Sequence, residues 1–505
     1  MRGLCAAAAV VLILAIVLGG GTRAGFLADV VVQIAASILL CLATWRWAGS
    51  PRGAIGKLGW IMLVTLAGLL VLQLAPIFPG LAPDIAAPLP AGSPEISSDG
   101  RWRLSWAPQA TWTAVASLIV PLAILGAVAQ LDLSGRLLLW RIVLGLGIAA
   151  VVLGFLQVAQ GPDSSLRFFE VTNPTDAVGF FANRNHFAAQ LYITLAFAAV
   201  WISAAARALT RRGALKTATA LSIAGASALL IVITVGLALA RSRAGLILAM
   251  PAVVGIGAMA LVAAPREGGV PRARWSSART VLLALGVAVL VAAQFGLARV
   301  ATRFDGGHVL DDLRVPLNIT TFQTAWSALP FGTGLGSFVP VYATVEKPAD
   351  AFAGYANRAH NDLAELLLET GIVGLALLIL FLVWYIPRAI RAWRAPAVDA
   401  DPAGVDLERA ATLVIALVLA HSLVDYPLRT TAVSALFSFA CALLVPPPPP
   451  REAPARTSGD SSAARRPRPP PLFSEPALPD PAAPKGEVGA WNDKIEWPDA
   501  WKSDR

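Results

Sequence analysis

The chain has 505 residues, of which 56% are hydrophobic and only 14% are charged, and its mean hydropathy of +0.66 is too high for a soluble globular protein. The apolar residues occur in blocks of about 20, the length that crosses a hydrocarbon core of roughly 30 Å as a helix, so the composition predicts an all-α, polytopic membrane protein. The net charge of +9 does not imply a nucleic-acid partner, because most Lys and Arg residues lie in short connections and in the C-terminal tail.

Hydropathy predicts twelve membrane-spanning helices. The first could instead be a cleaved signal peptide, because Arg2 precedes an apolar core and small residues surround Ala24. In chain order, the predicted spans lie near residues 4–20, 25–45, 58–79, 112–131, 138–160, 185–206, 217–240, 244–264, 280–298, 363–387, 408–426 and 430–446.

The connections between these spans alternate in positive charge. One alternate set carries 17 Lys and Arg residues, whereas the short connections of the other set carry 8. Because basic connections are retained in the cytoplasm, the first set is predicted to be cytoplasmic, together with both chain termini. The longest connection, residues 299–362, then lies on the outer side, and its length exempts it from the charge rule.

Two stretches have patterns other than a membrane span. Within the long connection, residues 314–329 have the pattern of an amphipathic helix, and GTGLG at 332–336 is typical of a turn. Residues 446–505 open with five prolines, contain 15 of the 37 prolines and lack apolar periodicity. We predict that they form a disordered cytoplasmic tail, whose Pro-rich stretches could alternatively dock a partner module.

The histidines all fall on the predicted outer side. Two of them end a short echo in the sequence, ANRNH at 182–186 and ANRAH at 356–360. Histidine exchanges a proton near neutral pH and the guanidinium fork of Arg suits phosphate oxygens, so an outward site with both would suit a phosphate-bearing lipid. The four histidines are His186, His308, His360 and His421.

Three arginines stand where the charge rule disfavours them. Arg241 and Arg243 belong to RSRAG, residues 241–245, which joins two spans on the outer side with almost no loop between them, and Arg184 begins another span. They must therefore lie at the membrane surface or in a cavity. Two roles are open for them: snorkelling to lipid headgroups, or binding an anionic substrate.

His360 precedes a helix that Asn361 is well suited to cap. Along that helix Asp362, Glu365 and Glu369 share one face. His360 lies well around the helix from Asp362 and Glu369, so neither carboxylate is an obvious partner for it. A surface or capping role is therefore the alternative to a catalytic role for His360.

His421 and Asp425 are four residues apart at the outer end of the eleventh predicted span and share a face. Such a pair could be a proton relay or a structural hydrogen bond. Asp311 and Asp312 could hold a cation, but no further acidic or His cluster surrounds them. We therefore predict no metal site.

Several of these segments together resemble the O-antigen ligase family, whose superfamily includes O-antigen polymerases and protein O-oligosaccharyltransferases. The most specific match is HN followed after nine residues by GxxG, met by His360, Asn361, Gly371 and Gly374. The resemblance covers roughly residues 150 to 445. The segments are GFFANRNHFA at 179–188, SRAG at 242–245, FGTGLGSF at 331–338, HNDLAELLLETGIVG at 360–374 and HSLVDYPLR at 421–429.

The resemblance implies a reaction and a set of residues. Such ligases transfer an undecaprenyl diphosphate-linked glycan to lipid A-core at the periplasmic face of the inner membrane, without a metal or other cofactor. By position, His360 would be the general base and Arg243 and Arg314 catalytic cations that stabilise the leaving diphosphate. A back-side displacement would invert the anomeric centre. We assign substrate binding to Arg184, Asn183, Asn185, Arg241, Asn361, His421 and Asp425.

The alternatives to a ligase are a polymerase of the same superfamily and a transporter. A transporter should carry charged or broken helices at mid-membrane, and Asp29 is the main mid-span charge in this sequence, so a transporter ranks last. The predicted partners are the lipid-linked donor, a glycolipid or glycan acceptor and membrane lipids. The predicted parts of the chain are N-terminal transmembrane helices at 1–150, a ligase-like domain with its periplasmic loop 299–362 at 151–445, and the tail at 446–505.

Overall fold

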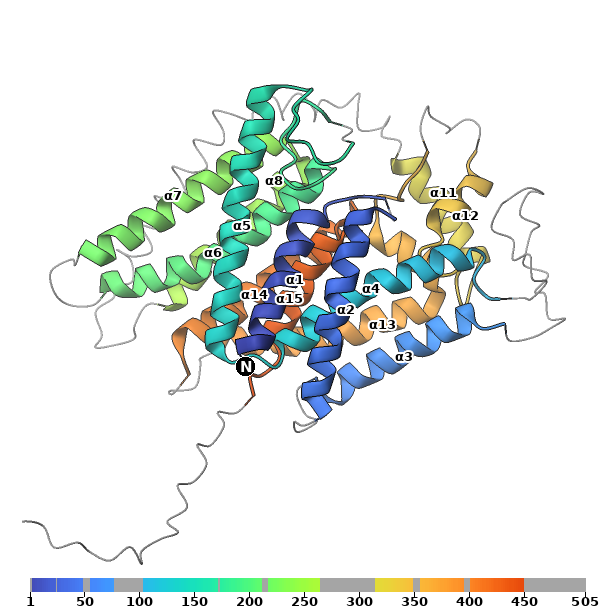
Figure 1. Cartoon of the computed structure of the whole chain (residues 1–505), viewed down its shortest axis with the longest axis horizontal. Coiled ribbons are helices and arrows are strands. Elements are labelled where there is room, and N and C mark those ends of the chain that lie inside the picture. The colour runs from blue at the N-terminus through green and yellow to red at the C-terminus, as the bar shows by residue number, and fades with distance from the viewer. Residues whose placement is uncertain are drawn as a thin grey trace, which may run out of the picture. The chain divides into compact units, whose positions relative to one another are not determined.

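Every regular element that the structure describes is helical, which confirms the predicted all-α polytopic class. The computed structural model describes residues 2–23, 25–48, 55–76, 103–170, 173–210, 217–263, 314–347, 355–394 and 400–448. The predicted span 280–298, His308 and the tail from residue 449 lie outside the described residues. In chain order the helices are α1 (Arg2–Leu18), α2 (Leu27–Ala48), α3 (Gly56–Leu74), α4 (Pro108–Val128), α5 (Leu133–Gln160), α6 (Arg184–Thr210), α7 (Thr217–Ala240), α8 (Arg243–Ala263), α11 (Arg314–Ser327), α12 (Phe338–Val345), α13 (Asp362–Trp393), α14 (Pro402–His421), the 3-10 turn η2 (Pro427–Arg429) and α15 (Thr431–Leu443) (Figure 1).

The helices match the predicted spans wherever the chain is described. Eleven of the twelve predicted spans fall on helices, and α11 and α12 belong to the long connection. Among the described helices, α2 to α8 and α13 are long and apolar enough to cross a membrane, whereas α1 and α15 are apolar but shorter. The chain is therefore a multi-pass membrane protein, and the number of its crossings stays a prediction.

Helix α6 lies at the centre of one group of packed helices and contacts α5, α7, α8 and α14. Its sequence is apolar on all sides and rich in alanine, which is the pattern of a helix that is buried all round. The first turn of α8 lies close against α6, because a Cβ atom at Gly245 would be only 2.4 Å from Ala188 Cβ. Glycine in SRAG therefore holds that motif beside ANRNH at the start of α6.

Helix α13 is broken at Gly371, whose φ of 59° and ψ of −145° are not helical. The GTGLG turn fills the break: Thr333 N donates to Leu368 O at 2.8 Å and Gly334 N donates to Glu369 O at 3.0 Å. A Cβ atom at residue 371 would lie 2.1 Å from Pro330 O. The predicted turn is thus confirmed, and it satisfies carbonyl groups that the broken helix leaves without helical partners.

Helices α11 and α12 pack over the first turns of α13. Their shared apolar core includes Leu317 of α11, Phe338 and Val341 of α12, and Leu368 of α13. The predicted amphipathic helix of residues 314–329 is confirmed as α11. This packing places the start of α11 beside the start of α13, where the HN motif lies.

The helix ends form two groups. At one end, Arg207 of α6 forms an ion pair with Asp406 of α14, with Nη1 and Oδ2 2.6 Å apart. At the other end, Asn185 Nδ2 of α6 donates to Asp425 Oδ2, just past α14, at 2.5 Å. The 15 residue steps of α14 from Asp406 to His421 separate these groups by about 22 Å. This grouping agrees with the predicted alternation of connections, and the compartment that each end faces stays a prediction.

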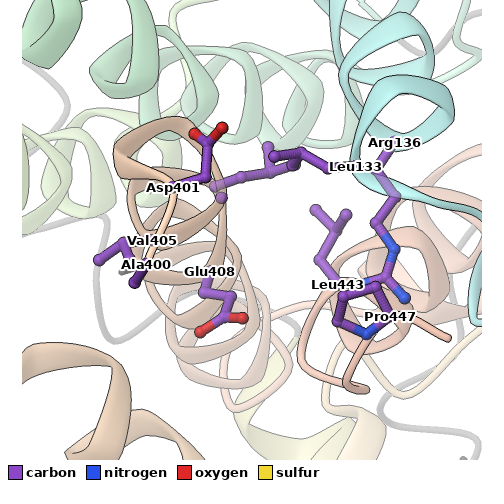
Figure 2. Close-up of a pocket in the computed structure, with 10 residues that line it drawn as sticks. Leu133, Arg136, Ala400, Asp401, Val405, Glu408, Leu443 and Pro447 are labelled. Carbon is purple, nitrogen blue, oxygen red and sulfur yellow. The ribbon is translucent and has the colours of Figure 1, made fainter. Parts of the chain in front are cut away.

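A pocket of about 190 Å³ lies at the Asp406 end of α14. Figure 2 shows Asp401 and Glu408 on the α14 side of this pocket and Arg136 of α5 on the other. The Arg136 guanidinium donates to Val445 O at 2.8 Å and Leu131 O at 3.0 Å, so it caps the ends of neighbouring helices. The pocket is thus remote from the HN motif.

Asp29 does not lie at mid-span, so that interpretation was wrong. It stands in the first turn of α2, where a carboxylate is favoured by the helix dipole, and it accepts a hydrogen bond from Thr431 Oγ1 at 3.2 Å. Helix α2 begins two residues later than hydropathy placed the span. Asp29 is therefore a carboxylate at a helix end and not the mid-membrane charge that a transporter would need.

Candidate active site

His360 is paired with a buried carboxylate. Its Nδ1 lies 2.9 Å from Asp425 Oδ1, its side chain is 23% exposed and that of Asp425 is fully buried. His360 adopts a φ of 54°, and Asn361 next to it caps α13 by accepting from Leu363 N at 3.0 Å. The prediction that Asn361 caps this helix is confirmed. Asn361 is therefore the residue that caps α13, and the ring of His360 is partly exposed at the surface.

Asp425 also shows why the predicted His421–Asp425 pair is the weaker one. His421 Nε2 is 4.0 Å from Asp425 Oδ2, which is too long for a hydrogen bond, because α14 ends at His421 and the helical spacing stops there. His421 Nδ1 instead lies 3.0 Å from the hydroxyl of Tyr192. His421 and Asp425 are both buried, which favours positioning roles over the substrate contact assigned from the sequence.

A chain of hydrogen bonds joins four of the motifs. Ser242 Oγ donates to Asn185 Oδ1 at 2.9 Å, and Asn185 Nδ2 donates to Asp425. Burial of the Asp425 carboxylate favours its neutral form, but the hydrogen bond and charge of His360 outweigh this effect and hold the pKa of Asp425 well below its usual range. SRAG, ANRNH, HSLVDYPLR and HN thus meet at one ionised carboxylate.

The two echoed segments meet at Tyr426. Asn183 Nδ2 and Asn357 Nδ2 each donate to its hydroxyl oxygen at 3.5 Å. His186 and His360 each stand nearly perpendicular to its ring, with centroids 4.8 Å and 4.9 Å away. Burial raises the pKa of Tyr426 to about 12, so its phenol stays neutral. The echo therefore has a structural meaning: both copies supply an amide and an imidazole to one tyrosine.

Asp176 holds two of the predicted arginines. Arg184 forms an ion pair with its Oδ2, and Arg241 Nη1 lies 3.0 Å from its Oδ1. The Asp176 side chain is buried, whereas those of Arg184 and Arg241 are partly exposed. Two guanidinium groups share one carboxylate, so the cluster keeps a net positive charge. The Asp176 carboxylate therefore fixes these two arginines.

The two arginines assigned to catalysis lie at the same end of the molecule. Arg243 is the first residue of α8, follows Ser242 of the hydrogen-bond chain and is partly exposed. Arg314 is the first residue of α11, and its Nη1 donates to Val424 O at 3.3 Å, one residue before Asp425. The structure thus brings Arg314 to the turn that carries Asp425, although 110 residues separate Arg314 from Val424.

The acidic face of α13 binds Arg429. Its Nη1 lies 2.6 Å from Glu369 Oε2, and its Nε lies 3.4 Å from Asp362 Oδ1 and 3.5 Å from Glu365 Oε2. The predicted shared face is therefore confirmed, and its partner is the last residue of HSLVDYPLR. Arg358 of the second echoed segment also pairs with Glu365, at 3.4 Å. These ion pairs fix the segment that carries His360 against the turn that carries Asp425.

The local sequence gave no signal for Asp425 as the partner of His360, nor for Asp176 as the partner of Arg184 and Arg241. Asp425 is 65 residues from His360, and Asp176 is 65 residues from Arg241 and 8 residues from Arg184, in the loop before α6. No spacing rule for a helix or a turn applies over such separations. The excess of positive charge at the start of α6 was the available hint that a buried carboxylate had to lie nearby.

Comparison with known proteins gives one match. Residues 227–397 match the family model described as O-Antigen ligase. No curated protein matches the chain. The matched region contains Arg241, Arg243, Arg314, His360 and Asn361, whereas Asn185 and Asp425, which bind this region, flank it. The match supports membership of the O-antigen ligase family, and it includes the HN residues at the start of α13 and the GxxG residues at its break.

Proposed function

We propose that the chain transfers a glycan from an undecaprenyl diphosphate-linked donor to an acceptor such as lipid A-core. The reaction takes place at the periplasmic face of the bacterial inner membrane, and both chain termini lie in the cytoplasm. Residues 151–445 carry the chemistry, and the helices of residues 1–150 support them. The observation that carries the proposal is the partly exposed His360 on a buried, ionised Asp425 with arginines on the adjoining turns.

His360 is the general base. With the Nδ1 proton donated to Asp425, Nε2 is the acceptor nitrogen and takes the proton of the attacking hydroxyl. The acceptor oxygen bonds to the anomeric carbon while the bond from that carbon to the diphosphate oxygen breaks, and its electron pair leaves with the diphosphate. Asp425 then stabilises the positive imidazolium. Attack from the face opposite the leaving group inverts the anomeric centre.

The arginines stabilise the diphosphate, which leaves with its negative charge. Arg243 and Arg314 lie on the two turns next to the His360–Asp425 pair. Arg184 and Arg241 are held in place by Asp176, and their shared positive charge remains in excess over that one carboxylate. Fixed guanidinium groups need little reorganisation as charge develops, so they lower the barrier without a metal ion or ATP.

Reconstitution tests the proposal. The full chain in lipid nanodiscs, supplied with lipid-linked glycan and lipid A-core, should produce glycosylated lipid A-core, and His360→Ala should abolish the product. Glu408→Gln, in the pocket at the other end of α14, is the matched control and should retain activity. Joining of two lipid-linked glycans without transfer to lipid A-core would identify a polymerase instead. Absence of transfer to either acceptor would contradict the proposal.

A further inference from the structure

Helix α11 exposes four large apolar side chains. Val315, Ile319, Phe322 and Trp326 are 51%, 49%, 40% and 75% exposed. Their spacing of four, three and four residues places them in one line along the helix, here called the α11 stripe. Thr320, Thr321 and Thr324 lie on the opposite face and are buried. Helix α11 as a whole packs on α13 (Figure 1).

Hydrogen bonds within α11 explain how it can bury threonine side chains while it exposes large apolar ones. Thr321 Oγ1 donates to Leu317 O at 2.7 Å, and Thr324 Oγ1 donates to Thr320 O at 2.9 Å. The hydroxyl groups of Thr321 and Thr324 thus bond within the helix and can be buried at low cost, whereas Thr320 Oγ1 is buried without a hydrogen-bond partner. Leu317 and Ala325 are buried on the same side as these threonines, whereas the four apolar side chains of the α11 stripe are exposed and can contact a lipid or a ligand.

The α11 stripe begins at the candidate active site. Arg314 directly precedes Val315 and donates to Val424 O. Leu423 and Val424, which are 56% and 49% exposed, extend the apolar surface to the residue before Asp425. A cation at the site followed by a line of apolar side chains is complementary to a lipid diphosphate, in which an anionic head is followed by a hydrocarbon chain.

We propose that the α11 stripe binds the isoprene units of the donor that lie nearest its diphosphate. This inference rests on the proposed function and names the part of the donor that α11 recognises. From Val315 to Trp326 the stripe runs for about 16 Å. Continuity with Arg314 and the Asp425 turn favours the donor chain over bulk bilayer lipid, because a face that served only as an anchor would have no reason to start at the catalytic turn.

Two donors separate chain binding from membrane anchoring. One carries the undecaprenyl chain, and the other carries the same glycan diphosphate on a single isoprene unit, which is too short to reach Phe322 or Trp326. In nanodiscs, Phe322→Ser should raise KM for the undecaprenyl donor about tenfold, the effect of losing one apolar side-chain contact, with little change in kcat. KM for the short donor should be unchanged, and Phe322→Leu should restore the long donor.

Ile379→Ser is the matched control, because Ile379 is 60% exposed on α13 beyond the break at Gly371. It should leave KM for both donors unchanged. An equal rise in KM for both donors in Phe322→Ser would overturn the inference and make the stripe a bilayer anchor. An equal rise for the undecaprenyl donor in the Ile379→Ser control would also overturn it. A wild-type chain inactive with both donors would instead overturn the proposed function.

Discussion

The ring of His360 is oriented by two contacts that come from one turn, the carboxylate of Asp425 and the face of Tyr426. The carboxylate fixes which ring nitrogen carries the proton, and the tyrosine limits rotation of the ring. We expect that removing either contact leaves His360 in place but changes the orientation of its ring or the nitrogen that carries its proton. The two residues therefore support separate predictions.

Asp425→Asn should lower kcat about 10²- to 10³-fold, within the range that general-base catalysis contributes. The amide can still contact His360, but it carries no charge to stabilise the imidazolium. KM for the donor should change little, because Asp425 is buried and would act through His360. Steady-state kinetics in nanodiscs measure both parameters, with Glu408→Gln as the control. A large rise in KM for the donor with unchanged kcat would contradict this role.

Tyr426→Phe removes the hydroxyl that accepts from Asn183 and Asn357 and retains the ring between His186 and His360. Both hydrogen bonds are long at 3.5 Å, so we expect a fall in kcat of about threefold to tenfold, corresponding to roughly 0.5–1.5 kcal/mol. Tyr426→Ala, which also removes the ring, should lower kcat further. Thermal unfolding in detergent should separate these effects on the rate from a loss of fold.

Arg243 and Arg241 should respond differently to replacement by Lys. Arg241 pairs with Asp176, and a Lys ammonium can keep that ion pair, so Arg241→Lys should retain much of the activity. Arg243, as a diphosphate ligand, uses a planar fork that Lys lacks, so Arg243→Lys should lose most transfer activity and bind the donor more weakly. Donor binding and initial rates measure the difference. Near-normal activity of Arg243→Lys would leave it as a membrane anchor.

At the scale of the element, the break in α13 joins the HN motif to the GTGLG turn. Ile372 N donates to Pro330 O at 2.9 Å, and Gln73 Nε2 of α3 donates to Glu369 O at 2.9 Å. The first turns of α13 are thus fixed by a turn and by a second helix. Hydropathy predicted a continuous span here, because one glycine does not interrupt an apolar pattern and its partner turn lies some 40 residues earlier.

Gly371→Ala should destabilise this junction. The left-handed φ of 59° disfavours any side chain, typically by about 1–3 kcal/mol, and the added Cβ would lie 2.1 Å from Pro330 O. We expect a lower unfolding temperature in detergent and a lower yield of folded protein. Gly257→Ala in α8 is the control, because a Cβ atom there meets nothing within 4 Å. Equal stability of the two variants would contradict the importance of the break.

At the scale of the whole molecule, the sequence predicts the features that depend on residues close together in the chain. Eleven predicted spans, the Asn361 cap and the shared face of Asp362, Glu365 and Glu369 all depend on residues close in the chain. The site depends on contacts between distant segments. The pairing of His360 with Asp425 needs α6, α13 and α14 to meet, which is a property of packing that no single pattern specifies.

The orientation of the molecule gives the last prediction. The charge asymmetry of 17 to 8 places the basic connections in the cytoplasm, so the site end of α14 should face the periplasm and its Asp401 end the cytoplasm. With the native Cys5, Cys41 and Cys441 replaced, Lys347→Cys, exposed after α12, should react with an impermeant thiol reagent in intact spheroplasts. Asp401→Cys should react only after permeabilisation, because about 30 Å of α14 separates it from the site. The reverse pattern of labelling would invert the protein and place His360 on the cytoplasmic side, where a periplasmic acceptor could not reach it.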